Sequence, residues 1–206
     1  MQSKDHWEHV YSTKAADTVS WFQPHADVST RLIRASGLGL DAAIVDVGGG
    51  ASTLVDDLLD AGYENLTVLD LSLAALTEAQ IRIGKRASKV RWLEGDITQV
   101  KLEPHSFDFW HDRAVFHFLT SAEDRASYVN QVLHALRPGG YVMMATFGAN
   151  GPTQCSGLPV VRYTPETLHS EFGNEFSMTS SEEQLHHTPF GTDQQFIYCM
   201  CRMLPA

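Results

Sequence analysis

The stretch Ala43-Ile44-Val45-Asp46-Val47-Gly48-Gly49-Gly50-Ala51-Ser52 is a short, β-branched apolar run that leads directly into three glycines. This pattern predicts a buried strand over 43–47, a tight turn, and a helix over 52–61. Glycine tolerates positive φ and carries no Cβ, so a glycine triplet between a strand and a helix indicates a ligand lying against bare backbone. An ordinary tight connection would produce the same pattern.

Acidic residues follow the next two apolar runs. The run 66–69 predicts a second strand that ends in Asp70, and the run 90–94 predicts a third strand that is followed by Gly95 and Asp96. The carboxyl ends of parallel strands meet at one edge of the sheet, where open α/β sheets bind their ligands. A carboxylate after the second strand of such a unit hydrogen-bonds a ribose diol in nucleotide-type sites.

These motifs, in this order, resemble the class I S-adenosylmethionine-dependent methyltransferases. The family's first motif is an acid followed by glycines at alternate positions, matched here by Asp46, Gly48 and Gly50, with Ser52 where a third glycine is usual. The turn Leu136-Arg137-Pro138-Gly139-Gly140, ahead of the apolar run 141–147, is similar to the family's lead-in to its fifth strand. The resemblance extends over roughly residues 43 to 147.

The resemblance implies an α/β fold: a doubly wound, mostly parallel seven-stranded sheet with helices on both faces and a C-terminal antiparallel hairpin. Helical stretches over 52–61, 73–87 and 122–136 alternate with the strands, as a parallel sheet requires. Thr164-Pro165-Glu166 predicts a helix start with Thr164 as its N-cap. The runs 175–187 and 194–203 flank a Pro- and Gly-containing turn and predict the hairpin.

We expect one methyltransferase domain over 1–206, with a helical leader over 1–40, a cofactor-binding core over 43–147, and a loop, helix and hairpin over 148–206. Within the leader, residues 4–12 and 24–36 are predicted to be helical.

The cofactor implied by the resemblance is S-adenosyl-L-methionine, with S-adenosyl-L-homocysteine as the product. The resemblance assigns Asp70 to the ribose hydroxyls and Asp96 to the adenine amine. The other residues expected to contact the cofactor are Tyr11, Trp21, Asp46, Gly48, Gly49, Gly50, Ser52, Leu71 and Ile97.

The chemistry at such a site is modest. A sulfonium methyl is already activated, so in-line displacement depends mainly on positioning and on exclusion of water, while an oxygen or nitrogen nucleophile also needs a base. The candidates follow the predicted fourth strand, 107–110: we expect Asp112 or His111 to line the acceptor pocket. His117 is a third catalytic candidate, or equally a hydrogen-bonded core histidine. Arg113 would pair with a cofactor or substrate carboxylate, or with Asp112.

Aromatic residues of the leader allow two interpretations. Trp7, Tyr11, Trp21 and Phe22 interleave with polar residues. In several family members a similar leader closes over the cofactor, where aromatic faces attract the sulfonium methyl; an amphipathic helix packed on the sheet explains the pattern equally well. Trp21, which precedes a Pro-bounded turn, is the residue we expect in a lid.

The acceptor is only partly predictable. After the predicted fourth strand the chain lacks an Asn or Asp followed by Pro-Pro and an aromatic residue, the family signature for planar amino groups. Only the leader and the loop 151–159, with Cys155, remain to form an acceptor site, so we expect a small-molecule acceptor and keep a protein side chain of the lysine type as the alternative. Two functions of other classes remain as alternatives: an NAD-dependent oxidoreductase and a non-catalytic cofactor-binding module. The incomplete G-x-G-x-x-G spacing disfavours the oxidoreductase.

Composition excludes several other classes. The 206 residues include 25 acids against 15 Lys and Arg, a net charge of −10, which disfavours nucleic acid as a partner. Three cysteines, Cys155, Cys199 and Cys201, form neither a disulfide framework nor a metal-binding pattern, so no metal is predicted. No apolar run approaches the ~18 residues of a membrane span, and the first residues lack the core of a signal peptide. We therefore expect a cytoplasmic protein, without membrane partners, that is a monomer or a weak homodimer.

Overall fold

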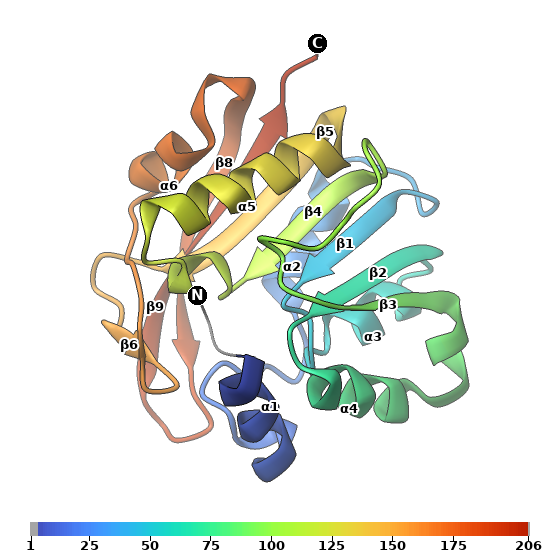
Figure 1. Ribbon diagram of the computed structural model, residues 1–206, viewed down its shortest axis with the longest axis vertical. Helices are drawn as coiled ribbons and strands as arrows, with labels where there is room; N and C mark the ends of the chain where they lie inside the picture. The colour runs from blue at the N-terminus through green and yellow to red at the C-terminus, as the bar shows by residue number, and fades with distance from the viewer. Residues whose placement is uncertain (1–3, 206) are drawn as a thin grey trace.

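The computed structural model describes residues 4–205, and Met1, Gln2, Ser3 and Ala206 lie outside the described residues. Its main sheet has seven strands in the order β3-β2-β1-β4-β5-β9-β8 (Figure 1). The strands are β1 (Ala43–Val47), β2 (Asn65–Asp70), β3 (Val90–Glu94), β4 (Phe107–Arg113), β5 (Leu136–Phe147), β8 (Phe176–His187) and β9 (Asp193–Met203). The first five pair in parallel, and β9 runs antiparallel between β5 and β8. The predicted fold, including its terminal hairpin, is confirmed.

Helices cover both faces of this sheet. They are α1 (Lys4–Thr13), α2 (Asp27–Ala35), α3 (Leu54–Asp60), α4 (Leu73–Ile83), α5 (Ala122–Ala135) and α6 (Pro165–Phe172). Helices α5 and α6 pack on one face, and α2 and α3 pack on the other (Figure 1). Short 3₁₀ turns, η1 (Ala16–Thr18), η2 (Gly84–Lys89), η3 (Phe116–Phe118) and η4 (Gly173–Glu175), and a two-stranded ribbon of β6 (Gln154–Cys155) and β7 (Leu158–Pro159) complete the described elements.

Strand alternation divides the interior into two hydrophobic clusters. Ile44 of β1 joins the cluster under α2 and α3, whereas its neighbours Val45 and Val47 join the cluster under α5 and α6. All five residues of β1 are buried, because a central parallel strand is covered on both sides. The glycine turn therefore follows the most enclosed strand of the sheet.

Side-chain caps set where several helices begin. Ser72 accepts from the Ala75 amide at the start of α4. Thr164 accepts from the Thr167 amide at the start of α6, with Pro165 in the first turn, as predicted. These caps satisfy amides that have no partner within the helix.

Several predicted boundaries are wrong, and two of them have a clear conformational cause. Helix α4 ends at Ile83 rather than at 87, because Gly84 adopts φ 60° and the chain continues as the 3₁₀ turn η2. Strand β5 begins at Leu136, which pairs with Phe107, so residues 137–140 bulge out of the ladder before pairing resumes at Tyr141. A Cβ on Gly140 would lie 2.9 Å from each of two carbonyl oxygens, which accounts for glycine in this bulge.

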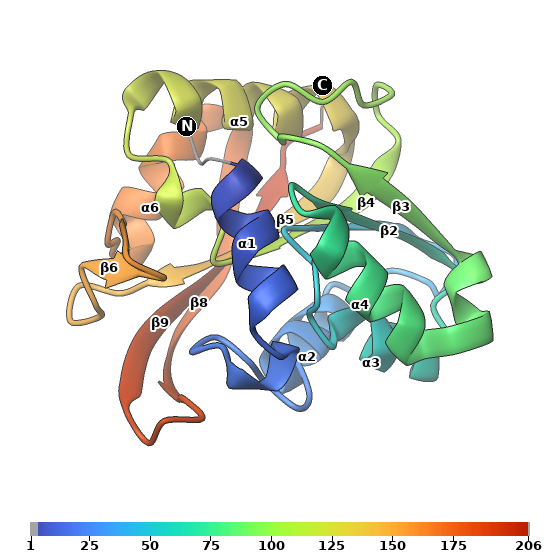
Figure 2. The same ribbon diagram turned by 60° about the horizontal axis from the view of Figure 1, so that its bottom comes forward.

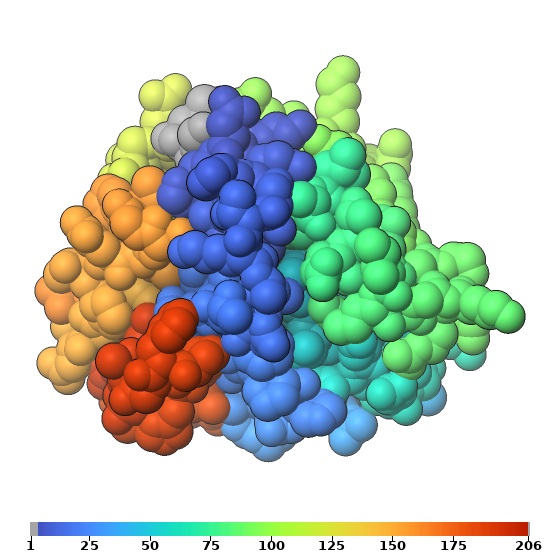
Figure 3. Space-filling model, turned by 90° about the horizontal axis from the view of Figure 1, so that it is seen from below, coloured from blue at the N-terminus to red at the C-terminus, as the bar shows by residue number. Residues whose placement is uncertain are grey.

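The leader crosses the edge where the parallel strands end. Figure 2 shows α1 between the β6 ribbon and α4, and in Figure 3 the leader forms a continuous ridge across this side of the molecule. Glu8 of α1 accepts from the Ser72 hydroxyl at 2.8 Å and from the Ala74 amide at 3.2 Å. This carboxylate lies at the N-terminus of α4, where the helix dipole favours negative charge, and attaches the leader to the sheet.

Within residues 4–205, no helix has both the length and the apolar character that a membrane crossing would require.

Candidate active site

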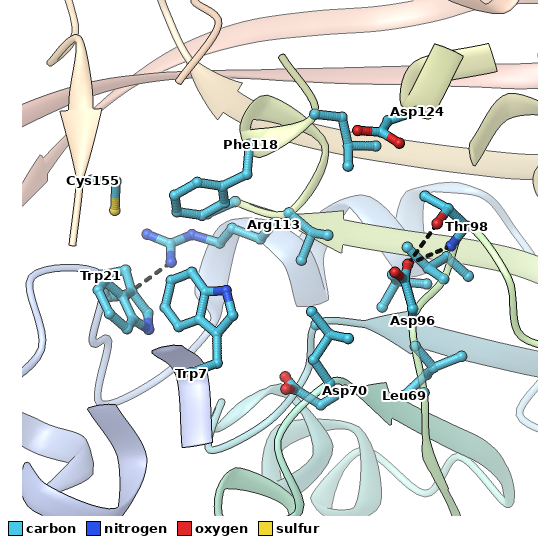
Figure 4. Close-up of a pocket in the computed structure, with 18 of the residues that line it drawn as sticks. Trp7, Trp21, Leu69, Asp70, Asp96, Thr98, Arg113, Phe118, Asp124 and Cys155 are labelled. Atoms are coloured by element: carbon cyan, nitrogen blue, oxygen red, sulfur yellow. Dashed lines mark hydrogen bonds between the residues drawn. The ribbon is translucent and has the colours of Figure 1, made fainter. Parts of the chain in front are cut away.

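A cavity lies at the carboxyl ends of β1 to β4, beneath α1. Figure 4 shows its two differently lined ends. We call the part formed by Asp70, Asp96 and Asp124 the acidic end, and the part formed by Trp7, Trp21, Arg113, Phe118 and Cys155 the aromatic end. The cavity lies at the sheet edge predicted from the acids.

The structure brings many of the predicted cofactor residues to this cavity: Tyr11, Trp21, Gly48, Asp70, Leu71, Asp96 and Ile97. It does not bring Asp46, Gly49, Gly50 or Ser52 there. Ser52 is used locally, because its hydroxyl accepts from the Leu54 amide and its carbonyl accepts from Arg82. The structure therefore places Gly48 of the segment 46–52 at the cavity, and it places Asp46, Gly49, Gly50 and Ser52 behind it.

At each position of the glycine triplet, a side chain would clash with a different neighbour. Gly48 adopts φ +67° and lines the cavity, and a Cβ there would meet Val115 at 2.0 Å. A Cβ on Gly49 would lie 2.5 Å from Asp46 Oδ2, and one on Gly50 would lie 2.6 Å from Asp70 Oδ2. The second and third glycines thus make room for two carboxylates, and only the first lies against the cavity.

Asp70 is a buried carboxylate with no cationic partner. It is 7% exposed, and its Oδ1 accepts from the Ser72 amide at 2.8 Å. Burial is the main cause that raises the pKa of Asp70 to about 7, with nearby Asp46 adding to the rise and backbone hydrogen bonds opposing it. Among residues 4–205 no basic side chain pairs with it. Such a group gains most from a ligand that donates hydroxyl protons to it.

Asp96 has one carboxylate oxygen used and one available. Its Oδ1 accepts from the Thr98 amide at 2.9 Å and from the Thr98 hydroxyl at 2.7 Å. Its Oδ2 receives no hydrogen bond from the described residues. The arrangement leaves an acceptor at the acidic end, as an amine donor would require.

His111 does not line the cavity, contrary to the prediction. Its Nδ1 lies 2.6 Å from Asp46 Oδ1 and its Nε2 lies 2.8 Å from Ser29 Oγ. Ser29, His111 and Asp46 are hydrogen-bonded in the order of a Ser-His-Asp catalytic triad. However, Ser29 is 1% exposed, and none of the three residues lines the cavity. Their hydrogen bonds instead connect α2 to β1 and β4.

Asp112 does not line the cavity either. It accepts from the Val115 amide at 2.9 Å, from the Phe116 amide at 3.1 Å and from the Tyr128 hydroxyl at 2.6 Å. Burial raises the pKa of Asp112 to about 6, and these hydrogen bonds oppose the rise. The structure does not bring His111 or Asp112 to the cavity, because β4 continues through Arg113 and keeps both residues within the sheet.

His117 has the environment of a core histidine. It is fully buried, lies outside the cavity lining, and its Nδ1 accepts from the Phe147 amide at 3.4 Å. Burial, followed by the positive charge on Arg113, lowers the pKa of His117 to about 3. A ring with so low a pKa is a poor general base near neutral pH.

Three leader aromatics, Trp7, Tyr11 and Trp21, line the cavity and also pack on one another. The centroid of Trp7 lies 5.7 Å from that of Trp21 and 5.2 Å from that of Phe118. Trp21 Nε1 donates to the Tyr11 hydroxyl at 3.3 Å. Burial raises the pKa of Tyr11, so this hydroxyl remains protonated.

Comparison with known proteins identifies the family. A family model described as a methyltransferase domain matches residues 44–140. EEF1A lysine methyltransferase 2 of Homo sapiens is 24% identical over 192 residues, covering 85% of this chain and 75% of that protein. The ubiquinone/menaquinone biosynthesis C-methyltransferase UbiE of Roseobacter denitrificans is 29% identical over 107 residues, covering 50% of this chain and 42% of that protein. Together, the matched methyltransferase domain and these relatives support a class I S-adenosylmethionine-dependent methyltransferase.

Other relatives differ from this methyltransferase chain in length. The chain spans only 20% and 18% of the eEF1A lysine and N-terminal methyltransferases of Mus musculus and Danio rerio, which are 22% and 28% identical over the matched parts. The solved structure of a SAM-dependent methyltransferase from Anabaena variabilis has a TM-score of 0.74 at 14% identity and covers 98% of this chain and 96% of its own. This structural likeness shows the shared fold.

S-adenosylmethionine is the cofactor of this family, and the prediction of that cofactor is confirmed at the level of the family. The residues of the acidic end fit it. Asp70 pairs with no cation among residues 4–205, and a Cβ at position 50 would crowd its carboxylate.

Sequence reasoning did not single out several lining residues, among them Thr98, Val115, Phe118, Leu119 and Asp124. Most come from the apolar run 114–119 that follows β4, of which only His117 was considered from the sequence. The signal that could have found them is their position directly after a strand of the binding edge.

Proposed function

We propose that this methyltransferase transfers a methyl group from S-adenosylmethionine to a small-molecule nucleophile bound at the aromatic end of the cavity. The observation that carries the proposal is the enclosure of that end. Trp7 is 8% exposed and packs edge-on against Trp21 and Phe118, and Cys155 from the β6 ribbon is 5% exposed. A site so enclosed by its own leader suits a compact acceptor.

At the acidic end, Asp70 would accept from the ribose hydroxyls and Asp96 Oδ2 from the adenine amine. Leu71 and Ile97 would supply apolar walls beside the base, and Gly48 would let the backbone approach the amino-acid part of the cofactor. When bound, the cofactor supplies a methyl group that a sulfonium has already activated.

The chain's own residues would then hold the acceptor in line and exclude water. The cavity lining in the described part of the chain includes no histidine, glutamate or lysine. Burial raises the pKa of the Cys155 thiol to about 12, so this group does not serve as a base at neutral pH. Positioning and desolvation, rather than a dedicated base, support the reaction.

The leader would act as the lid of this site. Its attachment points include the Glu8 contact with α4, the bond from Arg113 Nη1 to the Trp21 carbonyl at 2.9 Å, and the contact of His186 Nε2 with the Ser20 carbonyl at 2.8 Å. Opening of these contacts would admit the acceptor and release the product.

A protein lysine acceptor is the second candidate, supported by the names of several relatives. It would require the leader to swing away so that a polypeptide could reach the aromatic end. The enclosed position of Trp7 argues for the smaller acceptor.

A screen with a labelled methyl donor tests the proposal. Purified protein is incubated with labelled S-adenosylmethionine and, in separate reactions, with thiols, metalloid oxyanions, phenols, carboxylic acids, amines and cell-lysate proteins. We expect label in at least one small-molecule reaction. Label only in the protein fraction would favour the lysine alternative, and tight S-adenosylhomocysteine binding without any transfer would favour a non-catalytic module.

A further inference from the structure

Arg113 is a partly buried cation at the aromatic end, and among the described residues it has no counter-ion. Its Nε donates to the Tyr198 hydroxyl at 3.0 Å, its Nη1 donates to the Trp21 carbonyl at 2.9 Å, and its guanidinium carbon lies 4.6 Å from the ring centroid of Phe196. Its Nη2 is buried and has no hydrogen-bond partner. Within residues 4–205 no carboxylate forms an ion pair with it, and Asp112 is committed to Val115, Phe116 and Tyr128.

The positive charge of Arg113 shifts the pKa values of neighbouring side chains. After burial, it is the next cause that lowers the pKa of both His117 and His186. It also opposes the rise that burial causes in the pKa of the Cys155 thiol. The acids that line the cavity, Asp70, Asp96 and Asp124, belong to the acidic end (Figure 4).

A buried guanidinium with an unused N–H group is costly unless something neutralises it. The cofactor brings a sulfonium, a second positive charge, to the same cavity. A lysine ammonium would be a third positive charge, whereas an anionic oxygen would satisfy Nη2 and balance both cations. The rings of Trp7, Trp21 and Phe118 offer apolar surface beside this position.

We propose that Arg113 recognises a negatively charged acceptor, one that carries a carboxylate or a similar oxyanion next to an aromatic or apolar body. The proposal rests on the function proposed above and narrows its substrate class. It places Arg113 as the specificity-determining residue of the aromatic end and disfavours cationic acceptors.

Calorimetry on protein saturated with S-adenosylhomocysteine tests the proposal, with benzoate and acetate as anionic probes and benzamide and acetamide as their neutral counterparts. We expect benzoate to bind at least about tenfold more tightly than benzamide, the scale of a hydrogen bond to a charged group. Arg113→Gln should abolish this preference, and Arg113→Lys should retain part of it. Tyr198→Phe, which removes one Arg113 contact but keeps the charge, is the matched control and should keep the preference.

Equal binding of charged and neutral probes, or no detectable binding of either anion, would overturn the proposal. So would a loss of S-adenosylhomocysteine affinity in Arg113→Gln as large as its loss of benzoate affinity, because Arg113 would then hold the carboxylate of the cofactor. If Arg113→Gln fails to fold, the wild-type comparison and Arg113→Lys decide the question. The measurement needs no turnover, so a negative methyl-transfer screen with an intact anion preference would refute only the proposed function.

Discussion

Asp70 at the end of β2 and Asp96 after β3 line the cavity, whereas His111 and Asp112 near the end of β4 do not. Asp70 and Asp112 are both buried, and burial raises the pKa of each. Asp112 receives three hydrogen bonds from its own turn and helix α5, while Asp70 receives a backbone bond and faces open space. Burial with complete internal partners indicates a structural acid, and burial with spare acceptor capacity indicates a binding acid.

The largest expected effect is the loss of stability in Asp112→Ala, which tests whether Asp112 is a structural acid. Asp112→Ala removes the acceptor of two buried amides and of the Tyr128 hydroxyl, so we expect the free energy of unfolding to fall by about 3 kcal/mol or more. Chemical denaturation measures it. A variant that keeps wild-type stability but loses methyl transfer would instead place Asp112 in catalysis.

A second test concerns the space that Gly50 leaves for Asp70. Gly50→Ala places a Cβ at φ +31° and 2.6 Å from Asp70 Oδ2. We expect S-adenosylhomocysteine affinity to fall by about tenfold or more, because the carboxylate must move. Gly84→Ala is the matched control, since its φ is +60° but nothing lies within 4 Å of the added Cβ. It should lose stability and keep cofactor affinity, and equal affinity losses in both variants would contradict the steric explanation.

The sequence predicts the site residues after some strands and not after others. The apolar runs of β1, β2 and β3 end next to the turn Gly48 to Gly50, Asp70 and Asp96, so the sequence predicts these residues at the carboxyl edge of the sheet. The run 107–110 also stops at a polar pair, yet β4 pairs through Arg113, because His111 and Asp112 are accommodated inside the sheet by Asp46, Ser29 and Tyr128. These partners lie far away in sequence, so no local pattern reports them.

A different reason explains the lining residues that were missed. The course of the chain after β4 depends on the bonds from Val115 and Phe116 to Asp112, and on Ala114 at φ 72°. These contacts are local, but a positive φ at an alanine is not predictable from the residue type, and the apolar run 114–119 does not show that Val115 and Phe118 line the cavity.

The pH dependence of cofactor binding distinguishes the two acids further. Hydroxyl donors favour the ionised form of Asp70, so binding releases its proton and affinity should fall as the pH drops below the free-protein pKa of about 7. The expected limit is about tenfold per pH unit. Asp112 does not touch the ligand and should add no dependence of its own. Calorimetric titration of S-adenosylhomocysteine from pH 8 to pH 5.5 measures this, and a flat profile would contradict the assigned role of Asp70.

The smallest expected effect lies in the leader. Glu8→Gln keeps the shape but removes the charge at the N-terminus of α4, so we expect a loss of about 0.5–1 kcal/mol in stability. Hydrogen exchange should increase in α1 and in the first turn of α4, while α5 stays protected. Unchanged exchange in α1 would show that Glu8 does not hold the leader.

The most direct test of the acidic end is the dissociation constant of S-adenosylhomocysteine for Asp70→Ala, measured by calorimetry at pH 8 beside the wild type. Loss of the charged acceptor should weaken binding by roughly 1.5–3 kcal/mol, or about ten- to 150-fold. The free energy of unfolding should not fall, because the wild-type carboxylate is buried without a cation. An unchanged dissociation constant in a folded Asp70→Ala variant would contradict the assignment of Asp70 to the cofactor.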